Sequence, residues 1–249
     1  GEKRLALMER NEDVLEQLHP GYHDVVAQWI QKEPLWEAKR RLDIVRFRAG
    51  APHEVPHAKM ILLVTHQHGG GVEQVVQRRV AYYKKKSVKT LILRPHERGC
   101  ILEDPEHKDE FPSLSFRFSE DKELLRRLLH KGGLQFLELH HLAAYPAEIY
   151  PFLYSLNRHY SVYVHDYALF CQRVSLLGPD GAYCGEPEPS ACVTCIAIAG
   201  RNVKTEEPVS TYLAHSAQLL AQAHAVYGPS HDAACRMARH FPGLKCSII

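Results

Sequence analysis

Residues 59–86 read KMILLVTHQHGGGVEQVVQRRVAYYKKK and carry the strongest local pattern in the chain. The apolar run 60–64 is too short to span a membrane and has polar neighbours, which is typical of a strand buried on both faces. Three glycines follow, and from Val72 the apolar residues recur at three- and four-residue steps, as on one face of a helix. A strand, a glycine loop and a helix in this order present free backbone N–H groups to a phosphate or another anion.

The glycines Gly69, Gly70 and Gly71 are therefore candidates for a binding loop, because a side chain there would hold a ligand away from the backbone. They match neither GxGxxG nor the Walker loop, so an ordinary tight turn stays open as the alternative. Glu73 falls in the first turn of the predicted helix. It either stabilises the helix N-terminus or contacts a ligand hydroxyl.

The composition is that of a globular protein and narrows the function classes. The 249 residues are 45% hydrophobic and 24% charged, which suits one large domain or two small ones. Because 31 basic residues stand against 29 acidic ones, the net charge of +2 gives no electrostatic case for nucleic-acid binding. No run of 18 apolar residues and no signal-peptide core occurs. We expect a cytoplasmic protein, with peripheral association at the inner face of the membrane left open.

The order of predicted elements indicates an α/β fold. Residues 1–56 read as a helical extension that ends in a Gly- and Pro-containing linker at 49–56. After it, strands predicted at 60–64, 88–93, 114–118, 133–142, 160–164, 225–227 and 244–249 alternate with helices from Val72 and at 119–129, 146–158, 208–223 and 230–240, with a charged excursion at 94–112. Such alternation predicts a parallel sheet with right-handed crossovers. The expected fold is a Rossmann-like three-layer domain over 57–249, interrupted by a cysteine-containing insertion at 167–207.

Polar residues gather where the predicted strands end. These are His66 to Gly69 after the first strand, His140 and His141 at the fourth, His165 and Asp166 at the fifth, and Gly228 to Ser230 at the sixth. In a parallel sheet, ligands bind beyond the carboxyl ends of the strands. Each position alone is explained by a strand leaving the core, but together they favour a crevice.

His165 and Asp166 are the catalytic candidates. Adjacent side chains at a strand end point to opposite sides, so we expect each to address a different part of a substrate. Asp166 can accept a hydroxyl proton or orient a sugar hydroxyl, and His165 can donate or accept a hydrogen bond near neutral pH. Capping of the following turn is the alternative role for Asp166. His140, His141 and Ser230 complete the set as binding candidates.

Seven cysteines, an odd number without a secretion signal, indicate reduced thiols or metal ligands and not a disulfide framework. Four of them, Cys171, Cys184, Cys192 and Cys195, lie within the insertion and end in a Cys-x2-Cys pair. Two sulfurs two residues apart can both reach one tetrahedral ion, and structural zinc is the metal that suits four thiolates. The spacing matches no standard zinc finger, so free, partly buried thiols stay open as the alternative.

Five stretches resemble the N-terminal, acceptor-side domain of GT-B fold glycosyltransferases of the group-1, GT4-like family. They are HGGGVEQ at 68–74, HHL at 140–142, HDY at 165–167, YCGEPEPSACVTC at 183–195 and YGPSHDAACRMARHFP at 227–242. Each motif is degenerate, but their order and their places at strand ends are more specific. The resemblance covers residues 57–249.

The resemblance implies transfer of a sugar from a nucleotide-sugar donor to a glycan or lipid-linked acceptor, as in polysaccharide biosynthesis. In that family the glycine loop lies near the donor phosphates, the histidine at the position of His165 lies near the transferred sugar, and the acceptor occupies the crevice of this domain. The departing diphosphate is stabilised by positioned hydrogen-bond donors, and no metal or other cofactor is required.

Two departures from the family accompany the resemblance. The sequence given ends at Ile249, where the family continues into a second Rossmann-like domain that carries most nucleotide contacts, and Gln172 stands where related sequences have proline. We therefore expect an acceptor-side half without transfer activity of its own. A non-catalytic Rossmann-like binding module, which would use the insertion and the N-terminal helices for protein contacts, is the alternative. An NAD-dependent oxidoreductase fits less well, because GxGxxG is missing and Arg94 and Pro95 end the second strand where an acidic residue belongs.

Overall fold

The computed structural model describes residues 2–50, 59–97 and 99–249. The chain divides into two compact units, Gly1–Leu42 and Asp43–Ile249. Most of the linker predicted at 49–56, together with the predicted boundary at 56/57, lies outside the described residues. The second unit begins at Asp43, inside a helix that spans Trp36–Gly50. Ile44 and Phe47 of this helix are buried in the core of the sheet unit.

The first unit is helical, as the spacing of its apolar residues predicts. It contains α1 (Glu2–Leu18), α2 (Tyr22–Lys32) and the start of α3 (Trp36–Gly50). Gly21, in the left-handed conformation with φ of 81°, separates α1 from α2. No helix in the described residues is long and apolar enough to cross a membrane.

The second unit is built on one eight-stranded sheet in the order β4-β3-β2-β1-β5-β6-β7-β8. The strands are β1 (Met60–Val64), β2 (Lys89–His96), β3 (Gly99–Glu103), β4 (Ser115–Phe116), β5 (Leu134–Leu139), β6 (His159–Tyr163), β7 (Ala225–Gly228) and β8 (Cys246–Ile248). All neighbouring strands pair in parallel except at one edge, where β3 is antiparallel to both β2 and β4. The predicted parallel α/β sheet is confirmed, but the charged excursion at 94–112 contains β3, which the sequence reading missed.

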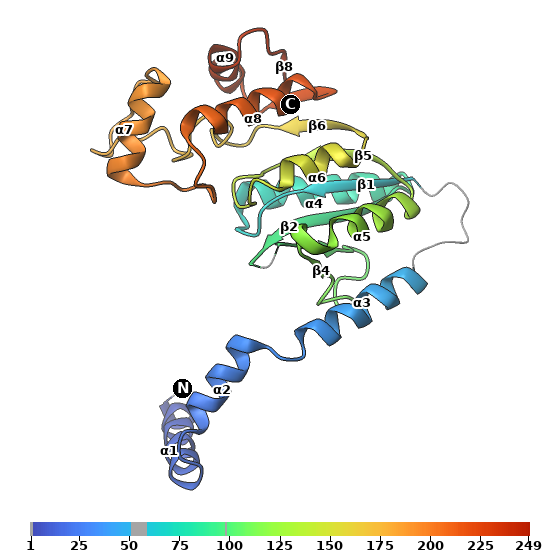
Figure 1. Ribbon diagram of the computed structural model, residues 1–249, viewed down its shortest axis with the longest axis vertical. Coiled ribbons are helices and arrows are strands. Elements are labelled where there is room, and N and C mark those ends of the chain that lie inside the picture. The colour runs from blue at the N-terminus through green and yellow to red at the C-terminus, as the bar shows by residue number, and fades with distance from the viewer. Residues whose placement is uncertain (1, 51–58, 98) are drawn as a thin grey trace. The chain divides into compact units, whose positions relative to one another are not determined.

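The helices that begin in this unit include the ones that form the outer two layers. The helices are α4 (Gly70–Lys85), α5 (Phe118–Lys131), α6 (Ile149–Ser155), α7 (Pro189–Ala199), α8 (Val209–Ala221) and α9 (His231–His240), of which α7 has no buried residue. Val76 and Val80 of α4 pack on one face of the sheet, against Ile61, Leu63 and Ile92. The large core on the other face receives side chains of α5, α6 and α8 (Figure 1). The three-layer Rossmann-like fold is thus present, and α7 is a helix that the sequence reading did not expect inside the insertion.

The order of the strands creates a crevice position beside β1. From β1 the chain passes through α4 to β2 on one side, and it later returns through α5 to β5 on the other side. Because neighbouring crossovers diverge there, the carboxyl ends of β1 and β5 flank a topological switch point, where sheets of this kind bind ligands.

Candidate functional site

The glycine loop follows β1 at the switch point. Gly69 and Gly70 have φ of 68° and 73°, a conformation that residues with a side chain rarely adopt. A Cβ atom at any of the three glycines would meet no atom within 4 Å, so the space beside the loop is open. Gly69 is the N-cap of the 16-residue helix α4 and offers no side-chain acceptor to the first turn. The N–H groups of that turn therefore receive no acceptor from the N-cap side chain, which is the condition in which a helix N-terminus can bind an anion.

Arg94 holds this loop from beneath. Its buried guanidinium donates to His66 O at 2.6 Å and pairs with Glu73 at 2.9 Å and with Glu103 at 2.8 Å. Although burial raises the pKa of Glu73, hydrogen bonds from Arg94 and Gln77 keep it below its ordinary value. Glu73, a candidate for ligand contact, is thus engaged in fixing the first turn of α4. Arg94 stands where a dinucleotide-binding fold would have an acidic residue, and here it positions His66 and Glu73.

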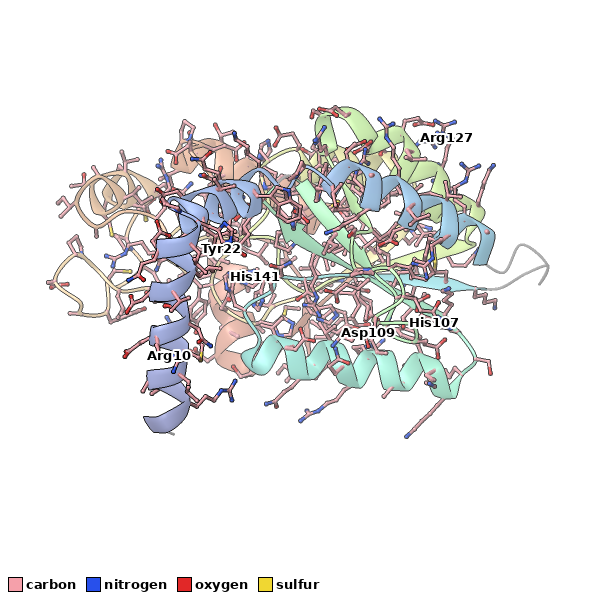
Figure 2. The ribbon with its side chains drawn as sticks, turned by 90° about the horizontal axis from the view of Figure 1, so that it is seen from below. Arg10, Tyr22, His107, Asp109, Arg127 and His141 are labelled. Carbon is pink, nitrogen blue, oxygen red and sulfur yellow. The ribbon has the colours of Figure 1, made fainter. Side chains whose placement is uncertain are left out.

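Two side-chain pairs, each containing a histidine from the end of β5, join the ends of β5 and β6. In the first, His141 Nε2 is 2.9 Å from Asp166 Oδ2, and His141 Nδ1 accepts from the backbone N–H of Ala143 at 3.3 Å. Since Nδ1 accepts, the hydrogen of the neutral ring is on Nε2 and is donated to Asp166. Figure 2 labels His141 among the side chains of the sheet unit.

Asp166 is held at both oxygens. Its Oδ1 accepts from the backbone N–H of Ala168 at 2.9 Å, so the turn-capping role is present together with the histidine pair. Burial raises the pKa of Asp166, but the hydrogen bond from His141 outweighs that effect and lowers it below the ordinary value. Asp166 is therefore a carboxylate with a fixed orientation.

The second pair joins His140 to His165. His140 Nδ1 lies 3.1 Å from His165 Nε2, and His140 Nε2 lies 3.5 Å from the carboxylate of Glu138. The carboxylate favours the His140 tautomer with hydrogen on Nε2, so His140 Nδ1 accepts and His165 Nε2 donates. This leaves Nδ1 of His165 as the nitrogen with a lone pair. Burial, followed by the neighbouring His140, lowers the pKa of His165 to about 4. The ring is neutral at pH 7.

Glu138 organises a buried network behind His140. Its carboxylate is almost fully buried and accepts from Arg79 through Nε at 2.9 Å and also through Nη2, from Tyr83 Oη at 2.5 Å and from Tyr163 Oη at 3.2 Å. Burial raises its pKa, yet the interactions with His140, Arg79 and Tyr83, in that order of size, bring it down to about 2. The sequence reading missed Glu138. The signal was a lone carboxylate inside an apolar strand, which requires a buried partner.

His66, which follows the first strand but was not among the residues expected to bind or react, is a further member of the cluster. Its ring centroid lies 4.6 Å from that of His141 and 5.2 Å from that of His68. The ring Nδ1 accepts from the backbone N–H of His68 at 3.0 Å. Burial, and then the adjacent histidines, lowers the pKa of His66 to about 4. It connects the glycine loop to the histidines after β5.

A small cavity lies behind these side chains. It has a volume of about 40 Å³ and is walled by His140, His141, His165, Asp166 and the segment 203–207. That volume holds a water molecule and not a sugar ring.

Ser230 lies apart from this arrangement in its hydrogen bonding. It follows β7, and its Oγ accepts from the backbone N–H of Ala233 at 3.2 Å as the N-cap of α9. The structure thus brings His140, His141, His165 and Asp166 together and gives Ser230 a capping role.

The four cysteines of the insertion meet at a second cavity. Cys171, Cys184, Cys192 and Cys195 all line a space of about 40 Å³, and all seven cysteines of the chain are free thiols. Burial raises the pKa of Cys192, and the three other thiols add to that effect. Among the described residues, no group of three or more His, Cys, Asp or Glu side chains stands in an arrangement that would already hold a metal ion.

Comparison with known proteins adds no assignment: no protein-family model and no curated protein matches this chain.

Proposed function

We propose that the chain is the acceptor-side half of a glycosyltransferase, which moves a sugar from a nucleotide-sugar donor to a glycan or lipid-linked acceptor at the inner face of the membrane. One observation carries the proposal. A neutral His165 with a lone pair on Nδ1 and an anchored Asp166 follow β6 and contact the histidines after β5, at the same edge of the sheet as the glycine loop after β1. The resemblance of the strand-end motifs to GT4-like enzymes supports the same reading.

Each part has a chemical task in such a transfer. The outward N–H groups at the start of α4 suit the negative charge that grows on a departing diphosphate. His165, with a pKa of about 4, is a poor base near pH 7 but a good acceptor for a hydroxyl hydrogen bond. Asp166 can orient a second hydroxyl without changing its own position. The chemistry is orientation and charge stabilisation, and it asks for no metal.

The test is sugar transfer by the protein joined to the second, nucleotide-binding domain that the resemblance implies, with a panel of labelled nucleotide-sugars. His165→Ala and Asp166→Asn should each lower kcat/KM by about 100-fold or more, because both act at the transferred sugar. His159→Ala is the matched control, since His159 is exposed at the start of β6, the other end of that strand. Transfer at the wild-type rate by both site variants would remove these residues from the reaction.

A non-catalytic binding module is the second candidate, and the first unit favours it. Helix α2 has no buried side chain, and large apolar residues of α1 and α2 are exposed, among them Leu5, Leu18, Val25 and Ile30. Such residues suit contact with another protein. Co-purification with a partner, without stabilisation by any nucleotide-sugar, would support this candidate over the first.

A further inference from the structure

We propose that Cys171, Cys184, Cys192 and Cys195 bind one structural zinc ion as thiolates, and that this ion holds the insertion 167–207 closed. The inference goes beyond sugar transfer and does not depend on it.

The four cysteines come from three separate local structures. Cys171 ends the turn after Asp166, where its N–H donates to Tyr167 O at 2.8 Å. Cys184 follows the short antiparallel bridge between Leu177 and Tyr183, and its own N–H donates to Leu176 O at 2.9 Å. Cys192 and Cys195 lie one turn apart on α7, so their side chains share one face of that helix. Three segments of the insertion therefore bring their cysteines to the same cavity.

The shared cavity suits an ion that needs no water. Its other walls are mostly apolar and include Phe170, Leu177, Pro187, Ile196 and Val209. A closed site of four thiolates is the usual form of structural zinc, whereas catalytic zinc keeps an open position. Soft sulfur ligands in tetrahedral number also select zinc over calcium and magnesium, which prefer oxygen.

Core packing and disulfide bonding explain the cluster less well. All four thiols are only partly buried, in contrast to Cys100, which is completely enclosed among core side chains. None of them is bonded to another. Four partly exposed thiols around one space, with no bond between them, are the set of groups that a closed four-thiolate site requires.

The thiols must draw together when the ion binds, because they do not yet stand in a metal-holding arrangement. With Zn–S bonds of about 2.3 Å, tetrahedral sulfurs lie about 3.8 Å from one another. A cavity of about 40 Å³ leaves the room for this closure.

The ion would also steady one wall of the candidate active site. Gln172, next to Cys171, accepts at its backbone oxygen from the N–H of Asn202 at 2.8 Å and donates its side-chain amide to Glu207 O at 3.1 Å. Lys204 N–H donates to the backbone oxygen of Ala143, two residues after His141, at 2.6 Å. Residues 203–207, which wall the cavity behind the histidines, are thus tied to the chain at Cys171.

The experiment is elemental analysis of the whole protein expressed with added zinc and purified under reducing conditions. We expect about one zinc ion per chain. The double variant Cys192→Ser/Cys195→Ser should retain less than about a tenth of that amount, since two thiolates bind zinc far more weakly than four. Cys235→Ser is the matched control, because Cys235 is exposed on α9 and contacts His231 instead of the cavity. It should keep the full amount.

Cobalt provides a readout that does not require the variants to fold. Wild-type protein stripped of metal and titrated with Co²⁺ should develop the intense visible bands of tetrahedral cobalt together with sulfur-to-cobalt charge transfer, saturating at about one ion per chain. Wild-type protein that neither contains zinc nor develops these bands would overturn the proposal. A Cys192–Cys195 disulfide in protein kept reduced throughout would overturn it as well.

Discussion

At the scale of single residues, the candidate site is defined by which nitrogen of each histidine carries a hydrogen. Both ring nitrogens of His141 are engaged, Nδ1 with the N–H of Ala143 and Nε2 with Asp166, so His141 positions Asp166. His165 contacts His140 through Nε2, and its Nδ1 has no hydrogen-bond partner among the described residues. His165 and Asp166, which are adjacent in the sequence, therefore have different partners. His140 contacts His165 and His141 contacts Asp166, and both partners follow the neighbouring strand β5.

The first prediction concerns pH. The pKa values of His66 and His165 are about 4 in the folded protein, below the ordinary 6.5 of the unfolded chain. Between these pH values the unfolded state binds more protons than the folded state, so the free energy of unfolding should fall as the pH drops from 6.5 towards 4. Above pH 6.5 both states hold the two histidines neutral, and the free energy of unfolding no longer depends on their protonation. Each histidine adds a slope on the order of 1 kcal/mol per pH unit. Urea unfolding of the wild type and of His66→Gln/His165→Gln at several pH values measures the difference.

The carboxylates of the site leave this window clear. Glu138 has a folded pKa of about 2 and Asp166 has one below its ordinary value, so the stability that they contribute is present at pH 5 to 7 and is lost only in stronger acid. His159→Gln, which changes an exposed histidine, is the control and should keep the wild-type slope. Equal slopes in the wild type and the double variant would show that the two histidines are not held neutral.

The second prediction concerns Glu138. Glu138→Gln removes the negative charge that Arg79, Tyr83 and Tyr163 share and leaves the guanidinium without its counter-ion. Because Arg79 is 26% exposed, water offsets part of the loss, and we expect the free energy of unfolding to fall by about 2 kcal/mol. Chemical denaturation measures it. The control is Glu123→Gln, since Glu123 also pairs with an arginine, Arg126, but in full contact with water. That variant should unfold like the wild type, and equal losses in both would argue against the buried network.

At the scale of secondary-structure elements, the chain places its functional groups by ending strands and starting helices at set positions. β1 ends before the glycine loop, and α4 begins within it. Arg94 at the end of β2 then ties the loop to the first turn of α4 through His66 O and Glu73. The loop is held by neighbouring elements, and its open side remains free for a ligand.

The third prediction tests the role of Ser230 at the start of α9. If its hydroxyl serves only as the N-cap, Ser230→Ala should lower the free energy of unfolding by about 1 kcal/mol, whereas Ser230→Asp, which keeps a side-chain acceptor, should preserve stability. Denaturation and nucleotide-sugar binding are measured on the same samples. Weakened binding in both variants, with unchanged stability, would return Ser230 to the ligand site.

Element type could be predicted from sequence where the apolar period was long or the run was short and bounded. The buried run 60–64 and the helical spacing from Val72 correspond to β1 and α4. The missed elements lacked such signals. β3 is five residues long and lies among charges, and α7 sits between prolines and glycines, where turn residues mask a helix. The predicted helix 146–158 is shorter, Ile149–Ser155, because Asn157 has a φ of 47°, which lies outside the right-handed helical region.

At the scale of the whole molecule, the strand-end rule located the candidate site, but side-chain partners were beyond it. Sequence order shows that His140, His141, His165 and Asp166 belong to one edge of the sheet. Only the packed structure shows that Glu138 supports His140 and that His141 supports Asp166. Partners of this kind are set by register between strands, such as Glu138 opposite Ser161, which local sequence does not encode.

The two margins of the sheet differ in a way that bears on self-association. The margin at β4 is two residues long, and both are buried. At the other margin, β8 carries the 54% exposed Ile248, and its outer backbone groups pair with no strand in the described sheet. An apolar strand with unsatisfied N–H and C=O groups is a template for a further strand. Concentrated solutions of this chain should therefore contain pairs of molecules joined through their β8 margins.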